Sequence, residues 1–106
     1  MYTQNRKAPR FPFVASVDVI ELHTDTRLKA RTSDLSHQGC YVDTLNPMPN
    51  GTTLRLHFAH QDQELHAVGR VVHSQPNMGM GIQFAEIVAS GPPTLDKWLA
   101  DLATSG

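Results

Sequence analysis

The stretch TLRLHFAHQDQELHAVGRVVHSQPNMGMGIQFAEI, residues 53–87, contains three strand-like segments joined by two turn-rich clusters. In the first segment Leu54, Leu56 and Phe58 share one side of the chain and polar residues alternate with them, which is the period of a half-buried β-strand. The clusters HQDQ and SQPNMG are rich in the Asn, Asp, Gly and Pro residues that favour turns. Short strands that follow one another through such turns predict antiparallel pairing.

The rest of the sequence extends this pattern to about six strands and one helix. Three more strand-like segments are FVASVDVIEL (residues 13–22), RLKARTSD (residues 27–34) and GCYVDTL (residues 39–45). In GPPTLDKWLADLATSG the apolar residues recur at i, i+3, i+4 and i+7, one face of a helix. Because closing a sheet removes its exposed edges, the sequence predicts an all-β fold: a six-stranded antiparallel β-barrel with a C-terminal α-helix. We expect Trp98 to pack this helix onto the mouth of the barrel.

Composition and charge exclude several classes of protein. The chain has 106 residues, a net charge of −1 and a pI near 6.6, which fits one domain and argues against the coating of nucleic-acid polymers. The single cysteine, Cys40, allows no internal disulfide. No apolar run approaches the roughly 18 residues of a membrane span, and the N-terminus lacks the apolar stretch of a signal peptide. We therefore expect a cytoplasmic protein without membrane insertion.

Catalytic and metal chemistry lack the residue patterns that they need. Ser36 and His37 are adjacent, so on a strand their side chains point to opposite faces and cannot form a nucleophile–base pair. Six histidines raise the question of zinc, but His57 and His60 in HFAH also face opposite ways, and only one cysteine is present. We expect no catalytic residue, no metal ligand and no cofactor.

Positive charge is concentrated ahead of the first strand, in QNRKAPRFPF (residues 4–13). Arg6, Lys7 and Arg10 lie within five residues, and Pro9 disfavours a helix in this segment, so a loop is expected. Arginine forks in such a loop suit phosphate oxygens and the O6/N7 edge of guanine. The competing interpretation is a frayed, solvated terminus.

A second polar motif, DLSHQG, lies at the junction between two expected strands. Asp34 and Ser36 share the parity of an extended segment, so both side chains can face one ligand, and Gly39 permits a close approach to the backbone. A carboxylate also suits the N1–H and N2–H₂ edge of guanine, whereas turns that contain Asp and Ser are common and simply cap backbone groups. With Arg6 and Arg10 these residues could form a receptor for a guanine nucleotide, and from the residues alone both interpretations stay open.

These motifs resemble those of the PilZ domain family. RKAPR is similar to the family's RxxxR motif, DLSHQG to its (D/N)xSxxG motif, and GRVVHSQPNMGMGIQF to its closing hairpin. PilZ domains are receptors for the bacterial second messenger cyclic di-GMP, so the resemblance implies a cyclic di-GMP receptor without catalytic activity. It implies that Arg6 and Arg10 contact phosphates and guanine edges, and that the segment carrying Asp34, Ser36 and Gly39 holds a guanine.

The resemblance also implies how the chain is divided and how it signals. Residues 1–12 form an N-terminal arm that folds over the ligand, and residues 13–106 form the barrel with its helix. The surface changed by ligand binding then signals to an unidentified protein partner. Many relatives carry tryptophan near the end of the GxVV strand, where this chain has His73, and imidazole offers a base less stacking area. Whether one ligand or an intercalated pair binds, and whether motility, pilus function or polysaccharide secretion is controlled, stays open.

Two other functions compete with the receptor. One is a ligand-independent adaptor of the same fold, for example in type IV pilus or motility control. The other is a small barrel for single-stranded nucleic acid, which would need a basic groove and exposed aromatic side chains. An aromatic content of 7% and the slightly acidic net charge argue against the second.

Overall fold

The computed structural model describes residues 9–88 and 91–105. Arg6, a predicted ligand-binding residue, lies outside these residues, as does most of the predicted arm. The described part of the chain forms seven strands and one helix: β1 (Phe11–Pro12), β2 (Ser16–Glu21), β3 (Arg27–Leu35), β4 (Gly39–Asp43), β5 (Thr53–His60), β6 (Gln63–Gln75), β7 (Gly79–Ile87) and α1 (Gly91–Ser105).

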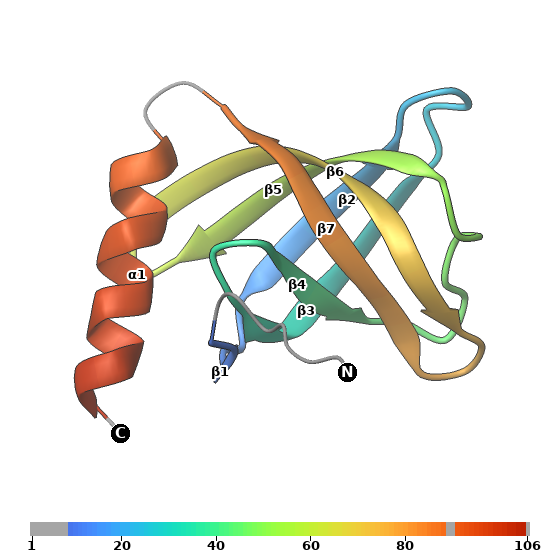
Figure 1. The fold of residues 1–106 in the computed structure, drawn as a ribbon. Coiled ribbons are helices and arrows are strands. Elements are labelled where there is room, and N and C mark those ends of the chain that lie inside the picture. The colour runs from blue at the N-terminus through green and yellow to red at the C-terminus, as the bar shows by residue number, and fades with distance from the viewer. Residues whose placement is uncertain (1–8, 89–90, 106) are drawn as a thin grey trace, which may run out of the picture.

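Six of these strands close into an antiparallel barrel (Figure 1). Their order is β3–β2–β5–β6–β7–β4, and β4 pairs back onto β3. Closure gives each of the six strands a partner on both sides, which protects their edges. The prediction of a six-stranded antiparallel barrel with one C-terminal helix is therefore confirmed. The two-residue strand β1 was not expected, because two residues are too few to show an alternation.

The chain runs along β3 in two pieces, β1 and β2, with a break at residues 13–15. Thr32 of β3 bridges this break from the inside, where its side chain is fully buried. Its hydroxyl donates to the carbonyl oxygen of Phe13 at 2.7 Å and accepts from the amide of Ala15 at 3.1 Å. The Thr32 side chain thus replaces ladder hydrogen bonds that the break removes.

The apolar sides of the strands fill the barrel. Leu54, Leu56 and Phe58, which the sequence places on one side of a strand, are all fully buried. The inward side chains of the remaining strands join them in one cluster that includes Val17, Val19, Leu35, Val42, Leu65, Val71, Met80 and Ile82. The period-two alternation in the sequence therefore identifies the core face correctly.

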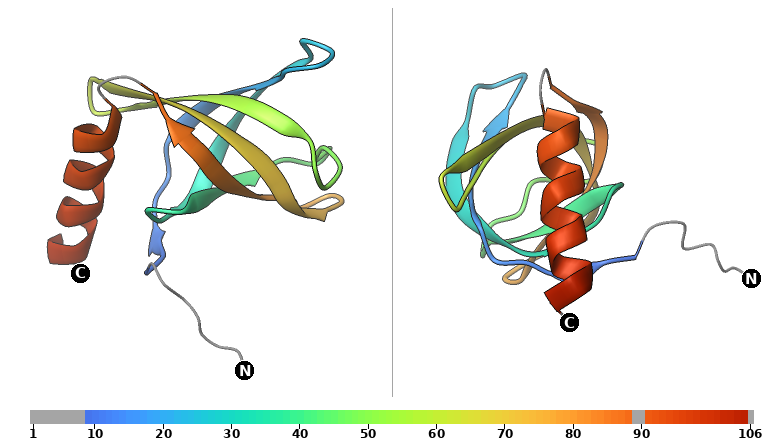
Figure 2. Two further views of the ribbon diagram at one scale, coloured as in Figure 1. Left: turned by 45° about the horizontal axis from the view of Figure 1, so that its top comes forward. Right: turned by 90° about the vertical axis from the view of Figure 1, so that its left-hand side faces the viewer.

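Helix α1 covers one end of the barrel (Figure 2). Leu95, Trp98 and Leu99 are buried on its inner side. The indole N–H of Trp98 donates to Oε1 of Gln63 at 2.9 Å, and its ring centroid lies 5.4 Å from that of Phe13. The indole is thus both packed and hydrogen-bonded, as a buried tryptophan requires, and the predicted role of Trp98 is confirmed.

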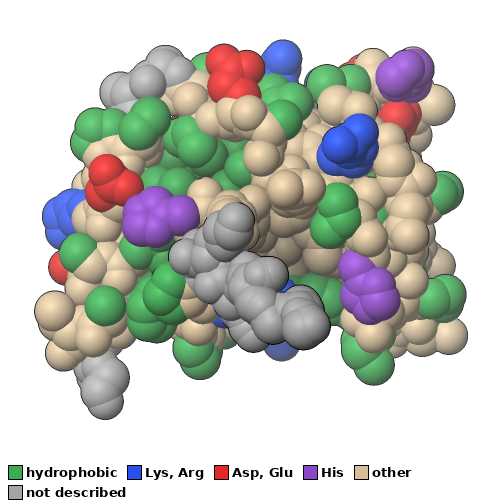
Figure 3. Space-filling model, viewed as in Figure 1, with side chains coloured by type: hydrophobic (Ala, Val, Ile, Leu, Met, Phe, Trp, Pro, Cys, Tyr) green, Lys and Arg blue, Asp and Glu red, His purple; other side chains and the backbone are tan. Residues whose placement is uncertain are grey.

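Within the described part of the chain, charged side chains form no large patch on the face of the barrel that Figure 3 shows. On the face in Figure 3, basic, acidic and histidine side chains of the described residues are scattered among polar and apolar ones. The described helix is neither long nor apolar enough to cross a membrane.

Candidate ligand-binding site

Arg10 and Asp34 form an ion pair that joins the two sequence motifs. The pairing of Pro12 with Asp34 in the β1–β3 ladder brings the preceding residues of the chain to the end of β3. There Nη2 of Arg10 lies 2.8 Å from Oδ2 of Asp34. The Arg10 side chain is 60% exposed and that of Asp34 is 25% exposed. Such exposed pairs contribute only about 0–1 kcal/mol to stability, so a ligand anion can compete for the guanidinium.

The second oxygen of the Asp34 carboxylate differs from the first. Oδ1 is buried, and no described residue forms a hydrogen bond with it. A buried acceptor without a partner is costly, since it loses its hydration and gains nothing in return. The carboxylate therefore has one oxygen held by Arg10 and one that is buried without a hydrogen-bond partner among the described residues.

Ser36 shapes the turn that follows. Its side chain is 7% exposed, and Oγ accepts hydrogen bonds from the amides of Gln38 and Gly39, both at 3.1 Å. The amide of Ser36 in turn donates to the carbonyl oxygen of Gly39 at 2.8 Å. The extended conformation assumed for Asp34 and Ser36 ends at Leu35, where β3 stops, so the Ser36 hydroxyl faces its own turn.

Gly39 lets strand β4 approach strand β7 closely. A Cβ atom at this position would overlap the carbonyl oxygen of Ile82 on β7. Because that oxygen belongs to the backbone, it cannot move aside without distorting the ladder between the two strands. The glycine of the second motif is therefore required by the barrel wall itself.

A row of outward-facing residues leads from Asp34 across the barrel wall to His73. Asp34 is opposite Tyr41, Tyr41 is opposite Gly81, and Gly81 is opposite His73 in successive ladders. Three strand spacings of about 4.8 Å place His73 roughly 14 Å from Asp34. The structure thus puts His73 on the same surface as the ion pair but out of contact with it.

Tyr41 is the member of this row that the sequence analysis missed. Its hydroxyl donates to Oε1 of Gln75 on β6. Partial burial, followed by the nearby carboxylates of Asp43 and Asp34, raises the pKa of Tyr41, so the phenol remains a neutral donor. A Cβ added to Gly81 would lie 3.9 Å from Cδ1 of Tyr41 and 3.5 Å from Cβ of His73.

Gly81 therefore lies between Tyr41 and His73 in the row and carries no side chain of its own. The alternating glycines of the GMG sequence, opposite an outward tyrosine, are the pattern that could have indicated this surface. Only the strand register, however, shows which residues are neighbours.

His37 connects the turn between β3 and β4 to helix α1. Its Nε2 lies 3.0 Å from Oδ1 of Asp96 in the first turns of the helix. Both side chains are more than half exposed. This exposed contact lies between the turn that joins β3 to β4 and helix α1.

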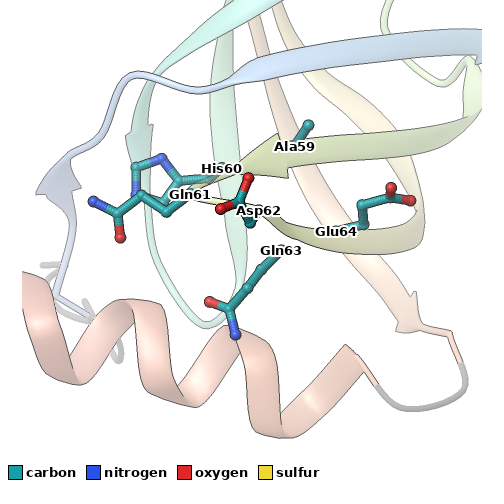
Figure 4. A pocket seen from close by; sticks show the side chains of 6 residues that line it. All are labelled: Ala59, His60, Gln61, Asp62, Gln63 and Glu64. Carbon is teal, nitrogen blue, oxygen red and sulfur yellow. The ribbon is translucent and has the colours of Figure 1, made fainter.

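A surface depression lies elsewhere, at the tip of the β5–β6 hairpin (Figure 4). Its lining is six consecutive residues, from Ala59 to Glu64. No predicted ligand-binding residue lines it, so the depression and the candidate site are separate places on the described surface.

By its fold the chain is a small β-barrel domain that is closed at one end by a C-terminal helix. The sequence profile of the PilZ domain matches residues 4–99. The chain belongs to the PilZ domain family. This family includes cyclic di-GMP receptors, and its domains are generally non-catalytic binding domains. The family that the sequence motifs suggested is confirmed.

Solved structures share this fold at low sequence identity. The PilZ domain of YcgR from Escherichia coli, with c-di-GMP, is 14% identical, with a TM-score of 0.75 over 96% of this chain and 94% of that one. The PilZ domain of CeSA from a cellulose-synthesizing bacterium is 17% identical, with a TM-score of 0.64 over 91% and 96%.

The Bacillus subtilis inhibitor of motility (MotI/DgrA) is 18% identical, with a TM-score of 0.71 over 91% of this chain. The match spans 49% of that protein, so this chain corresponds to about half of its length. No curated protein sequence matches the chain.

Proposed function

We propose that this chain is a receptor for cyclic di-GMP, and that Arg10 and Asp34 form the centre of its binding site. The observation that carries the proposal is their ion pair, which unites the RxxxR and (D/N)xSxxG motifs at one place on the barrel wall. Family membership supplies the ligand class, since PilZ domains include cyclic di-GMP receptors. The E. coli YcgR domain with c-di-GMP has the same fold.

Arg10 supplies the positive charge. Cyclic di-GMP carries two phosphates and two guanines, and the guanidinium fork matches phosphate oxygens and the O6/N7 edge of guanine. Because the pair with Asp34 is exposed, exchanging it for a ligand contact costs little. Arg6 would add a second guanidinium, and residues 1–12 would act as an arm that folds over the bound ligand.

Asp34 supplies the acceptor. Its buried Oδ1 lacks a hydrogen-bond partner among the described residues, and guanine presents N1–H and N2–H₂ as adjacent donors. A donor that satisfies a buried acceptor removes an existing desolvation penalty, which makes the contact stronger than one formed from a hydrated carboxylate. The turn built by Ser36 and Gly39 would hold the base beside this carboxylate.

Gly81 would offer a base a surface without a side chain. Tyr41 and His73 flank this glycine, and His73 is exposed, so a purine that extends beyond Asp34 would lie across the row. Imidazole stacks over less area than the tryptophan of many relatives. We therefore propose a weaker contribution from this position than the family pattern would give.

Signalling to a partner would use the contact between His37 and Asp96. The turn that would bind the ligand carries His37, which contacts helix α1. Ordering of the arm and movement of this turn would change the surface around the helix, which an unidentified protein partner would read.

Isothermal titration calorimetry with cyclic di-GMP, and with GTP for comparison, tests the proposal. We expect saturable binding of cyclic di-GMP and no comparable heat with GTP, and the stoichiometry distinguishes one ligand from an intercalated pair. Absence of heat from a sample with a cooperative thermal transition would contradict the proposal and favour the ligand-independent adaptor.

A further inference from the structure

Two histidines and a glutamate converge on the outer wall of the barrel, at residues outside the proposed ligand site. His57 on β5 is directly opposite His66 on β6. Their rings are stacked, with centroids 4.3 Å apart and planes 3° from parallel. Glu64, two residues before His66, lies on the same face of β6, just after the hairpin tip (Figure 4).

Polar atoms of these three side chains lie close together. Oε1 of Glu64 lies 2.9 Å from Nε2 of His57 and 3.9 Å from Nε2 of His66. One ligand atom from each residue lies within 4.8 Å of the others. Zinc–nitrogen bonds of about 2.0–2.1 Å place two ligands a little over 3 Å apart, so the two rings, which lie parallel, would turn toward each other to bind one ion.

A carboxylate lies near the second ring nitrogen of His57. Its Nε2 faces Glu64, and its Nδ1 lies 3.7 Å from Oδ2 of Asp18 on β2, within ion-pair reach but beyond hydrogen-bond distance. Metal-ligating histidines usually present their second ring nitrogen to a carboxylate, which fixes the orientation of the ring. Lys29 in turn holds Asp18 at 3.3 Å, so the supporting carboxylate is itself oriented.

We propose that His57, Glu64 and His66 form a binding site for a divalent transition-metal ion of the zinc class. Two imidazoles and one carboxylate are ligands that such ions accept, whereas Ca²⁺ and Mg²⁺ require oxygen ligands. Three protein ligands leave one tetrahedral position to solvent. Both strands belong to one hairpin, so the ion would clamp its two strands together.

The position of the hairpin gives this clamp a structural consequence. Gln63, adjacent to Glu64, accepts the hydrogen bond from Trp98 of α1. An ion that binds the folded hairpin alone stabilises the fold by mass action. The site does not depend on cyclic di-GMP binding, since none of its residues belongs to the row from Asp34 to His73.

The test is a titration of the chain, free of any polyhistidine tag, with ZnCl₂ by calorimetry, together with thermal melts in Zn²⁺ and in Mg²⁺. We expect one saturable Zn²⁺ site and a higher melting temperature with Zn²⁺ but not with Mg²⁺. His66→Ala and Glu64→Gln should each weaken Zn²⁺ binding at least about tenfold, and Asp18→Asn about tenfold, the usual effect of losing an orienting carboxylate.

His23→Ala is the matched control. His23 is exposed and lies 3.8 Å from a carboxylate oxygen of Glu21, but no second imidazole stacks on it among the described residues. This variant should bind Zn²⁺ as the unmodified chain does. Absence of a saturable site, or equal affinity in His66→Ala and His23→Ala, would overturn the proposal.

Discussion

At the scale of single residues, two buried side chains lie in the barrel wall near the candidate site. Thr32 replaces missing ladder hydrogen bonds, and Cys40 packs into the core opposite Leu35. Neither role follows from local sequence: a threonine in a strand is usually outward, and a lone cysteine has no characteristic pattern. Their surroundings depend on which strands lie beside β3, which the sequence does not encode locally.

Replacement of Thr32 by valine, which has nearly the same shape, should lower the free energy of unfolding by about 2 kcal/mol. The hydroxyl is lost, and the Phe13 carbonyl and the Ala15 amide are left buried without this partner. Thr32→Ser keeps the hydroxyl and loses one methyl group, so it should cost only about 1 kcal/mol. Urea denaturation measures both values, and a valine variant as stable as the unmodified chain would show that the bridge is unimportant.

The Cys40 thiol should be unreactive in the folded protein. Burial, and secondarily the charge of Asp34, raises the pKa of Cys40, while Arg10 opposes this weakly. We expect alkylation by iodoacetamide to be negligible in the native chain at pH 8 and rapid in urea. Alkylation of the native chain at the unfolded rate would contradict this expectation.

The same burial makes stability depend on pH. Because the fold holds the Cys40 thiol neutral, its contribution to stability is fully present below the unfolded thiol's pKa of about 8.5 and is lost as pH rises toward the folded-state value.

At the scale of elements, the alternation of apolar residues predicted the strands and their inner faces, and the 3.6-residue period predicted the helix. These patterns show which way a side chain points, but not which strand lies beside it. For that reason the sequence suggests His60 as the possible partner of His57 in metal binding, whereas the histidine beside His57 in the fold is His66, across the ladder. Tyr41 was missed for the same reason, since its row exists only through the register of four strands.

The β5–β6 hairpin provides an element-scale prediction. Gln61 and Asp62 connect the strands with φ values of 51° and 64°, the left-handed conformations of a two-residue type I′ turn. Asp62→Gly should remove the cost of a side chain in this conformation and stabilise the fold by about 1 kcal/mol. This corresponds to a rise in melting temperature of roughly 4 °C. Asp62→Ala keeps the Cβ and should bring no such gain, so equal melting temperatures in the two variants would contradict the explanation.

At the scale of the whole molecule, the fold brings together motifs that lie far apart in the sequence. The segment that enters β1, the end of β3 and the turn into β4 meet where Arg10 pairs with Asp34. The family motifs predicted that Arg10 and Asp34 share one site, and the structure places the two side chains in contact. The pair itself, the buried Oδ1 of Asp34 and the contact of His37 with α1 emerged only with the closed barrel.

The affinity for cyclic di-GMP of Arg10→Ala, measured by calorimetry beside Arg27→Ala, tests the central claim most directly. Both variants lose one exposed arginine and one ion pair with an aspartate, since Nη2 of Arg27 lies 3.6 Å from Oδ1 of Asp25. A hydrogen bond to a charged group contributes about 1.5–3 kcal/mol, so Arg10→Ala should bind about ten- to a hundredfold more weakly. Arg27→Ala should bind as the unmodified chain does. Equal affinities in the two variants would contradict the assignment of the site to Arg10 and Asp34.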